Sequence, residues 1–177
     1  MNKFRNKRFD GVTYQFSHLN SMRIEVELKN SNTSEDLTAC IEIHFSHHCF
    51  TVEFADEAHQ EHHTYFHSGE KRAFDIDRYA LSLQLPAHMH RISGAYIHHA
   101  DNGNYRYMVD IPIEGSKNRS YSIFFNLALK SKAQRNHLKM YVVSAYIKSA
   151  KLKANARTRR FKSLVAEVSD IFAGTGG

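Results

Sequence analysis

The sequence predicts the α+β fold class: an antiparallel sheet with a central helical unit and a C-terminal amphipathic helix. Segments in both halves alternate apolar and polar residues, the middle of the chain has apolar residues at helical spacing, and the last segment shows helical spacing again. The 177 residues suffice for one buried core and are few for two. We therefore expect residues 1–150 to form a single domain, with residues 151–177 as a basic amphipathic helix and tail that packs on it or extends from it.

The first strands are predicted from apolar-polar alternation. Residues 22–29 (MRIEVELK) alternate without interruption, as expected of a strand with one buried face, and residues 11–19 are a candidate strand before them. Residues 41–45 and 50–54 alternate in the same way. The break between them at residues 46–49 predicts a turn or bulge between two short strands.

Two polar stretches and a helical unit follow from the remaining patterns of this half. Residues 29–36 and the histidine-rich residues 55–71 lack apolar periodicity, so we expect loops. Residues 75–85 have acidic residues in the first turn and apolar residues at helical spacing. Because proline is tolerated only in the first turn of a helix, Pro86 should open a second short helix over residues 87–92.

The second half of the sequence predicts a series of antiparallel strands. These strands are expected at residues 95–99, 105–113, 121–129 and 138–148. The pair Asn102-Gly103 between the first two is typical of a tight hairpin with two positive-φ positions. The last two flank a basic turn at residues 130–136, and apolar spacing over residues 151–173 predicts the C-terminal helix, ending at Gly174.

Composition narrows the class of protein. Hydrophobic residues make up 42% and aromatic residues 12% of the chain, which excludes a disordered polypeptide. No window approaches the roughly 18 consecutive apolar residues of a membrane span, and the start has no apolar leader, so we expect a cytoplasmic protein without a membrane partner. Cys40 and Cys49 are too few for a disulfide framework. A formal net charge of +6 favours RNA or another polyanion as partner, although it also serves solubility.

Metal binding is the first hypothesis raised by the 13 histidines. They cluster at residues 44–48, 59–67, 88–90 and 98–99. No C-x-x-C or H-E-x-x-H spacing occurs, and strand alternation is expected to place His44, His47 and His48 on both faces. We therefore expect no metal and no other cofactor. A histidine-rich metal-binding protein ranks third, after the two hypotheses described below. For Cys49, the same alternation argues against activation by His48, and a buried structural cysteine is expected.

His48 stands apart because a strand break can aim its side chain into a cleft. A histidine with a pKa near neutrality can take the proton of a ribose 2′-hydroxyl, and arginine can stabilise the charged phosphorane, without any metal. Arg72 and Arg78 are the candidate phosphate-binding cations. The alternative for both is helix capping or a surface salt bridge with Asp75 or Asp77.

A resemblance to known families rests on short motifs. Ser144-Ala145-Tyr146 on the last predicted strand resembles the small-x-Tyr element of the EndoU-like and barnase-like ribonucleases and RelE-type toxins. The chain also resembles uncharacterised bacterial and phage proteins through its His-Cys-Phe-Thr turn, an Arg-Tyr-x-x-Ser-x-x-Leu-Pro helix that contains Ser82, and the Ser-Ala-Tyr strand. This resemblance implies a toxin-like or phage or mobile-element effector, with RNA and an inhibitor or antitoxin protein as partners.

The resemblance and the residue types together give the leading hypothesis, a metal-independent ribonuclease that cleaves RNA by 2′-hydroxyl attack. The candidate catalytic residues are His48, Arg78 and Tyr146. The candidate substrate-binding residues are Arg72, Ser82, Ser144 and Lys148. The alternative is a non-enzymatic module that binds nucleic acid or protein through the basic residues of 130–136 and 151–162. The ribonuclease hypothesis requires His48 and Tyr146 to lie within about 10 Å of each other, so that both reach one substrate phosphate and base.

Overall fold

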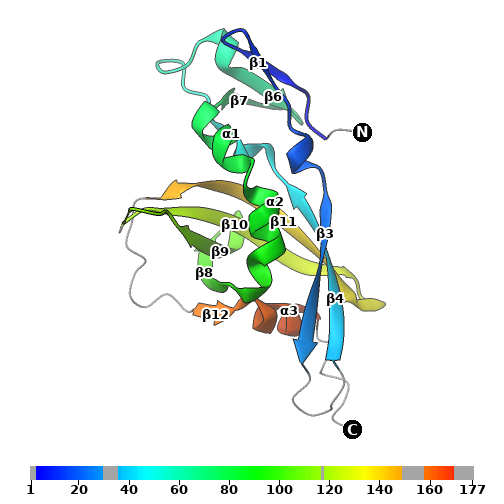
Figure 1. The fold of residues 1–177 in the computed structure, drawn as a ribbon. Helices are drawn as coiled ribbons and strands as arrows, with labels where there is room; N and C mark the ends of the chain where they lie inside the picture. The colour runs from blue at the N-terminus through cyan, green and yellow to red at the C-terminus, as the bar shows by residue number, and fades with distance from the viewer. Residues whose placement is uncertain (1–2, 30–35, 117, 149–157, 170–177) are drawn as a thin grey trace.

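The computed structural model describes residues 3–29, 36–116, 118–148 and 158–169. Its largest element is a seven-stranded sheet with the order β12-β8-β9-β10-β11-β4-β3, which occupies the centre of the molecule (Figure 1). The strands are β3 (Met22–Lys29), β4 (Asp36–Phe45), β8 (Tyr96–Asn102), β9 (Tyr105–Pro112), β10 (Ser120–Ser131), β11 (Gln134–Lys148) and β12 (Thr158–Arg160).

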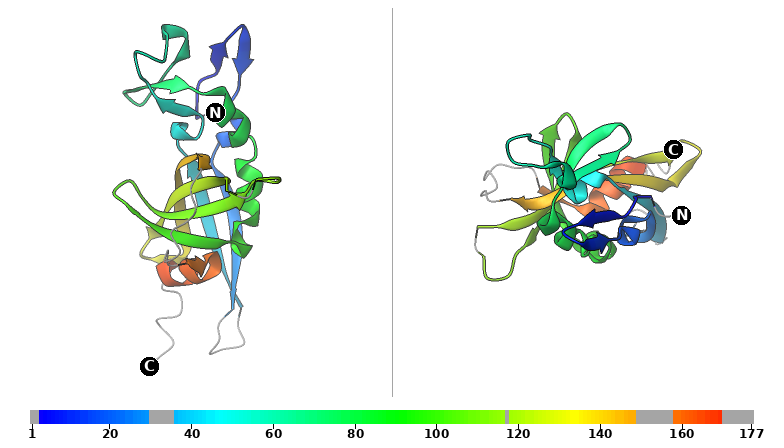
Figure 2. Two further views of the ribbon diagram at one scale, coloured as in Figure 1. Left: turned by 90° about the vertical axis from the view of Figure 1, so that its left-hand side faces the viewer. Right: turned by 90° about the horizontal axis from the view of Figure 1, so that it is seen from above.

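A smaller group of strands lies beyond one end of the large sheet (Figures 1 and 2). It contains a three-stranded sheet of order β5-β7-β6 and the hairpin β1-β2. The bounds are β1 (Lys7–Phe9), β2 (Val12–Tyr14), β5 (Thr51–Glu53), β6 (Thr64–His67) and β7 (Glu70–Phe74). Two-residue turns with positive φ at both positions, Asp10-Gly11 and Ser68-Gly69, close the hairpins β1-β2 and β6-β7.

The helices are short. They are the 3₁₀ turns η1 (Ser17–Leu19), η2 (His47–Cys49), η3 (Glu61–His63) and η4 (Ile92–Gly94), and the α-helices α1 (Ile76–Ser82), α2 (Leu85–Arg91) and α3 (Phe161–Ser169). Asp75 caps α1 by accepting a hydrogen bond of 2.7 Å from the backbone N–H of Arg78. Pro86 lies in the first turn of α2, which confirms the predicted break between two helices. No helix of the described residues is long and apolar enough to cross a membrane.

One continuous apolar core joins the two groups of strands. Helix α2 contacts β3, and α3 contacts β3, β10 and β11, so both helices cover the face of the large sheet that carries Ile41, Met140 and Phe125. The core extends into the smaller group as a set of packed aromatic rings, in which Phe16 stacks on Phe50 with a centroid distance of 4.0 Å. Burial of such rings stabilises this end of the molecule.

The α+β class, the C-terminal helix and the strand prediction for residues 22–29 are confirmed. The predicted hairpin between β8 and β9 also forms, but its turn is Gly103-Asn104 and Gly103 does not have positive φ. The expected antiparallel sheet is confirmed only in part, because most strand pairs are antiparallel but one pair in the large sheet is not. Strand β11 pairs in parallel with β4, with Leu138 beside Ile41, so the large sheet is mixed. Alternation predicts a buried face but not the direction of the neighbouring strand.

Two further expectations are corrected. Residues 55–71 are not one loop, because they contain η3, β6 and the start of β7. Residues 158–160 form β12, which pairs with β8, so the last helix begins only at Phe161. The rest of the predicted helix, residues 151–157 and 170–173, lies outside the described residues. Strand β11 also carries a bulge at Val143, because Val142 pairs with Phe125 and Ser144 with Phe124.

Candidate functional site

The histidine turn, defined as Ser46 and the 3₁₀ turn η2 that follows it, lies where the large sheet meets the smaller group of strands. Strand β4 ends at Phe45, and the backbone N–H of the next residue, Ser46, donates to the carbonyl of Val142 at 2.9 Å. The Ser46 hydroxyl then accepts from the backbone N–H of His48, which starts the 3₁₀ turn η2. The predicted turn is confirmed. Because its backbone is not extended, His47 and His48 do not point to opposite faces as expected, and their ring centroids lie 4.6 Å apart.

Glu70, the first residue of β7, joins the two imidazoles. Its Oε2 lies 3.2 Å from Nε2 of His47 and 3.1 Å from Nε2 of His48. Its Oε1 accepts a hydrogen bond of 2.9 Å from Nη1 of Arg72. Arg72 Nε donates to the hydroxyl of Thr51, which donates in turn to the carbonyl oxygen of His47. These contacts hold the histidine–glutamate cluster, defined as His47, His48 and Glu70, in one arrangement.

The cluster contains a neutral base and a carboxylate at neutral pH. His47 is only 7% exposed, and burial, followed by the nearby charge of His48, lowers its pKa to about 4. Partial burial of Glu70 favours its neutral form, but hydrogen bonds from His48 and Arg72 outweigh this and lower its pKa to about 2. Although 3.2 Å separates His47 Nε2 from Glu70, the two atoms are not aligned for a hydrogen bond, and this buried nitrogen has no hydrogen-bond partner among the described residues.

Arg78 contacts the histidine turn through the backbone. Its Nη1 donates to the carbonyl oxygens of His48 at 3.2 Å and Thr51 at 2.8 Å. Its guanidinium carbon lies 4.8 Å from the ring centroid of Tyr146. Burial lowers the pKa of Arg78 from its ordinary value. Arg78 therefore touches both His48 and Tyr146, the two residues whose proximity the ribonuclease hypothesis requires.

Ser144 and Tyr146 lie on β11 beside the same turn. The Ser144 hydroxyl is 3.5 Å from the carbonyl oxygen of His48, a weak hydrogen bond. The Tyr146 ring stacks on Phe124 with a centroid distance of 4.9 Å, and burial raises its pKa. Lys148 is the last residue of β11 and is partly buried. The bulge at Val143 leaves these three side chains outside the apolar core, whereas Ala145 is buried within it.

Two candidates have other surroundings. Ser82 is fully buried, and its hydroxyl lies 2.9 Å from Nε2 of His18 and donates to the carbonyl of Tyr79. The Ser82 side chain therefore has no access to solvent in this structure, unlike those of Arg72, Ser144 and Lys148. Cys49 is also fully buried, and burial raises its pKa to about 12. This confirms the structural reading of Cys49, because a thiol held protonated is a poor nucleophile.

Sequence reasoning missed Glu70, Thr51 and the role of His47. Only Glu70 has a signal in the sequence. The Ser68-Gly69 pair before it predicts a turn, and a strand is expected to start after that turn. Two of the other histidines serve turns. His59 Nδ1 accepts from the backbone N–H of Ala55, and His63 Nδ1 accepts from that of Gln60, each at 3.0 Å.

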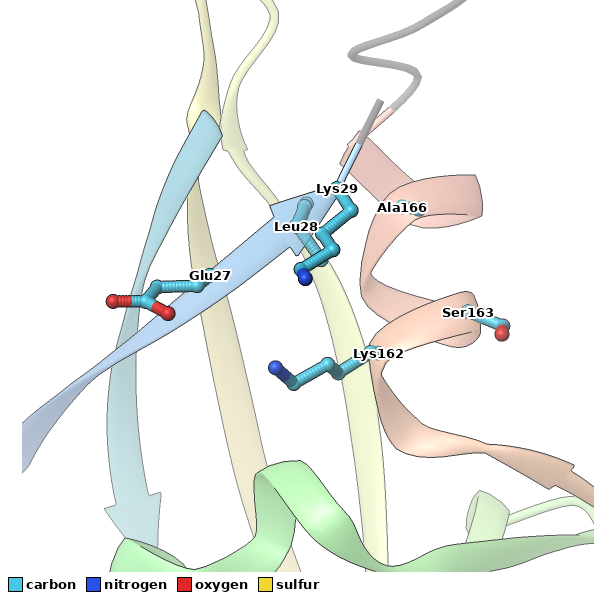
Figure 3. A pocket seen from close by; sticks show the side chains of 6 residues that line it. All are labelled: Glu27, Leu28, Lys29, Lys162, Ser163 and Ala166. Carbon is cyan, nitrogen blue, oxygen red and sulfur yellow. The ribbon is translucent and has the colours of Figure 1, made fainter. Parts of the chain in front are cut away.

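A separate pocket of about 300 Å³ lies between β3 and α3 (Figure 3). Its lining residues are Glu27, Leu28, Lys29, Lys162, Ser163 and Ala166. Figure 3 shows the Lys162 side chain reaching from α3 towards β3. The pocket contains none of the candidate site residues, and its charges of both signs do not select one class of ligand.

The chain matches the sequence model of a known protein family. Residues 6–169 match the sequence model of the YjaZ family. No curated protein and no solved structure shows significant similarity to the chain. The match spans both groups of strands, all the helices given above and the whole histidine–glutamate cluster. The chain therefore belongs to the YjaZ family.

Proposed function

We propose that the chain is a metal-independent ribonuclease that cleaves RNA by attack of the ribose 2′-hydroxyl, with His48 as general base. The observation that carries this proposal is the hydrogen bond between Nε2 of His48 and Oε2 of Glu70 at 3.1 Å. A carboxylate in this position fixes the tautomer and orientation of an imidazole and stabilises its protonated form. The His48 side chain is 30% exposed, which leaves it accessible to a substrate.

The chemistry assigns a role to each group. Nε2 of His48 keeps its proton and donates a hydrogen bond to Glu70. Nδ1 of His48 then accepts the proton of the 2′-hydroxyl. The 2′-oxygen then bonds to phosphorus and the 5′-oxygen leaves, which gives a 2′,3′-cyclic phosphate and a 5′-hydroxyl. Tyr146, held protonated because burial raises its pKa, is the candidate donor to the leaving oxygen. Arg72, Arg78 and Lys148 supply positive charge for the phosphorane.

Substrate binding would use side chains of β11. Ser144 and Tyr146 lie beside the histidine turn, so their hydroxyl groups are the candidate contacts to the substrate. The formal charge of +6 raises the local concentration of a polyanion around the whole molecule. The biological proposal is a toxin-like or phage or mobile-element effector in the cytoplasm, controlled by an inhibitor or antitoxin protein.

RNA cleavage tests this proposal. Total RNA is incubated in chelator with the wild type, His48→Ala and Glu70→Gln, and His90→Ala, an exposed histidine on α2, is the matched control. We expect cleavage by the wild type and the control, with a loss of about 10²- to 10⁴-fold for His48→Ala. Equal rates for wild type and His48→Ala would remove His48 from the mechanism. No cleavage by the wild type would overturn the ribonuclease proposal.

A second candidate function is non-enzymatic binding of nucleic acid. It is favoured by the tip of the β10-β11 hairpin, where Lys130, Lys132 and Arg135 are all exposed. RNA binding that weakens steeply with salt, without cleavage, would support it. Replacement of Lys132 by glutamate should then weaken binding, whereas His48→Ala should leave it unchanged.

A further inference from the structure

The histidine–glutamate cluster has the dimensions of a metal site. One possible ligand atom from each of His47, His48 and Glu70 lies within 4.8 Å of the other two. Zinc bonds of about 2.0–2.1 Å in tetrahedral geometry place neighbouring ligand atoms about 3.3–3.4 Å apart. The distances from Glu70 Oε2 to the two nitrogens, 3.2 and 3.1 Å, are close to that separation. Both separations that involve Glu70 therefore already match those of a tetrahedral zinc site.

The buried nitrogen of His47 is a second, independent observation. His47 is 7% exposed, and its Nε2 is among the few buried side-chain atoms of the described residues that lack a hydrogen-bond partner. Burying a polar group without a partner costs about 1–3 kcal/mol, so such an atom needs an explanation. A metal ion bound through its lone pair would satisfy this nitrogen.

The contacts around the cluster are those that orient metal ligands. Arg72 binds Oε1 of Glu70 at 2.9 Å and leaves Oε2 directed at the imidazoles. Thr51 anchors the backbone of His47 by a hydrogen bond of 2.8 Å. Such outer contacts fix the rotamers of ligating side chains. The Arg72 charge offsets that of Glu70, which disfavours Mg²⁺ and Ca²⁺, ions that depend on several oxygen ligands. Two imidazoles and one carboxylate suit zinc.

We propose that His47, His48 and Glu70 bind one zinc ion through Nε2, Nε2 and Oε2, with the fourth position open to solvent. The open side follows from exposure, because the side chains of His48 and Glu70 are 30% and 44% exposed whereas His47 is buried. Zinc binding does not depend on RNA cleavage. Where cleavage occurs, zinc inhibits it, because a metal on Nε2 leaves the proton of His48 on Nδ1, the atom that has to accept the 2′-hydroxyl proton.

Zinc titration of untagged, chelator-treated protein tests the site, with a competing chromophoric chelator as readout. We expect one tightly bound zinc per chain, and a loss of affinity of about 10- to 100-fold or more for His48→Ala and for Glu70→Gln. The control is the double variant Glu61→Gln/His62→Ala, which removes an exposed glutamate and histidine of η3 and should bind zinc as the wild type does. Substitution with Co²⁺ should give the visible absorption of a tetrahedral site.

The outcomes separate this inference from ribonuclease activity. No stoichiometric zinc in the wild type, or equal affinity in Glu70→Gln, would overturn the metal site, whatever the protein does to RNA. Glu70→Gln is nearly isosteric, so it tests the ligand without emptying space, and far-ultraviolet circular dichroism checks that each variant is folded. Because RNA cleavage is assayed in chelator and zinc binding without RNA, each proposal can fail alone.

Discussion

Arg78 binds the carbonyl oxygen of His48, not its imidazole. The 3.2 Å contact and the 2.8 Å contact to the Thr51 carbonyl both use Nη1, so one cation joins the middle residue of η2 to the first residue of β5. The backbone N–H of the same residue is bound by the helix cap Asp75. Arg78 therefore connects α1 to the turn that carries both imidazoles, and its contribution to any chemistry there includes holding that turn in place.

Replacement of Arg78 by alanine should destabilise the protein. The change removes charge-assisted hydrogen bonds to two carbonyl groups and the contact with the Tyr146 ring, so we expect a loss of about 2–3 kcal/mol in the free energy of unfolding. Urea denaturation measures it. Arg78→Lys, which keeps the charge but not the planar donors, should fall between wild type and alanine. The exposed Arg8→Ala should differ little from wild type, and a similarly small loss for Arg78→Ala would show that the turn does not need this cation.

The two cysteines should differ in reactivity towards a thiol reagent. Both are free, but Cys49 is fully buried with a pKa raised to about 12, whereas Cys40 is partly exposed on β4. Since the thiolate is the reactive form, one thiol should react in the native protein and two after unfolding in guanidinium. Cys40→Ser protein should show no native reaction and one thiol when unfolded. Rapid reaction of both thiols in the native state would contradict the burial of Cys49.

The sequence predicts local elements well where a single pattern decides them. The alternation of residues 22–29 and the break before Pro86 each correspond to an element in the structure. The parallel pairing of β11 with β4 could not be predicted from the sequence. The paired residues are nearly a hundred positions apart, and apolar-polar alternation does not indicate which strand lies beside another. Strand β6 was missed because four residues, with Phe66 exposed opposite buried Tyr65, are too few to show a period.

The site was predictable only in part. The strand break in the sequence indicates His48 as a candidate, and the turn at that position is confirmed. An extended strand would direct the His47 and His48 side chains to opposite faces, whereas the 3₁₀ turn brings them together. Glu70 lies on another sheet, 22 residues from His48, and no pattern in the sequence records that approach. The chemistry of the cluster thus depends on a tertiary contact that residue types alone do not encode.

The stability of the protein should fall as the pH falls below about 6.5, in part through His18. Burial lowers the pKa of His18 in the folded state from its ordinary value of 6.5, so the unfolded chain takes up the proton more readily. His18 therefore stabilises the fold above pH 6.5, and this contribution is lost on acidification. Urea denaturation at pH 7.5, 6.5 and 5.5 should show a shallower pH dependence for His18→Gln. His90→Gln should keep the wild-type dependence, and an identical slope in both variants would exclude His18 as a source.

Gly69 lies in the tight turn next to Glu70, a ligand of the proposed metal site. It has φ of +83° between Ser68 and Glu70, a conformation that residues with a Cβ rarely adopt. Gly69→Ala should therefore cost about 1 kcal/mol in the free energy of unfolding. Because the strain falls next to Glu70, the variant should also bind zinc more weakly. Urea denaturation and the zinc competition assay measure the two effects.

Substitutions at two other glycines show whether backbone strain anywhere in the protein, or only strain next to Glu70, weakens zinc binding. Gly11 has φ of +79° in the equivalent turn of the β1-β2 hairpin, so Gly11→Ala should lose similar stability and keep wild-type zinc affinity. Gly94 has no positive φ and open space around an added Cβ, so Gly94→Ala should lose neither. If Gly11→Ala weakened zinc binding as much as Gly69→Ala, the effect would come from lower overall stability, and the turn before Glu70 would have no specific role in placing that ligand.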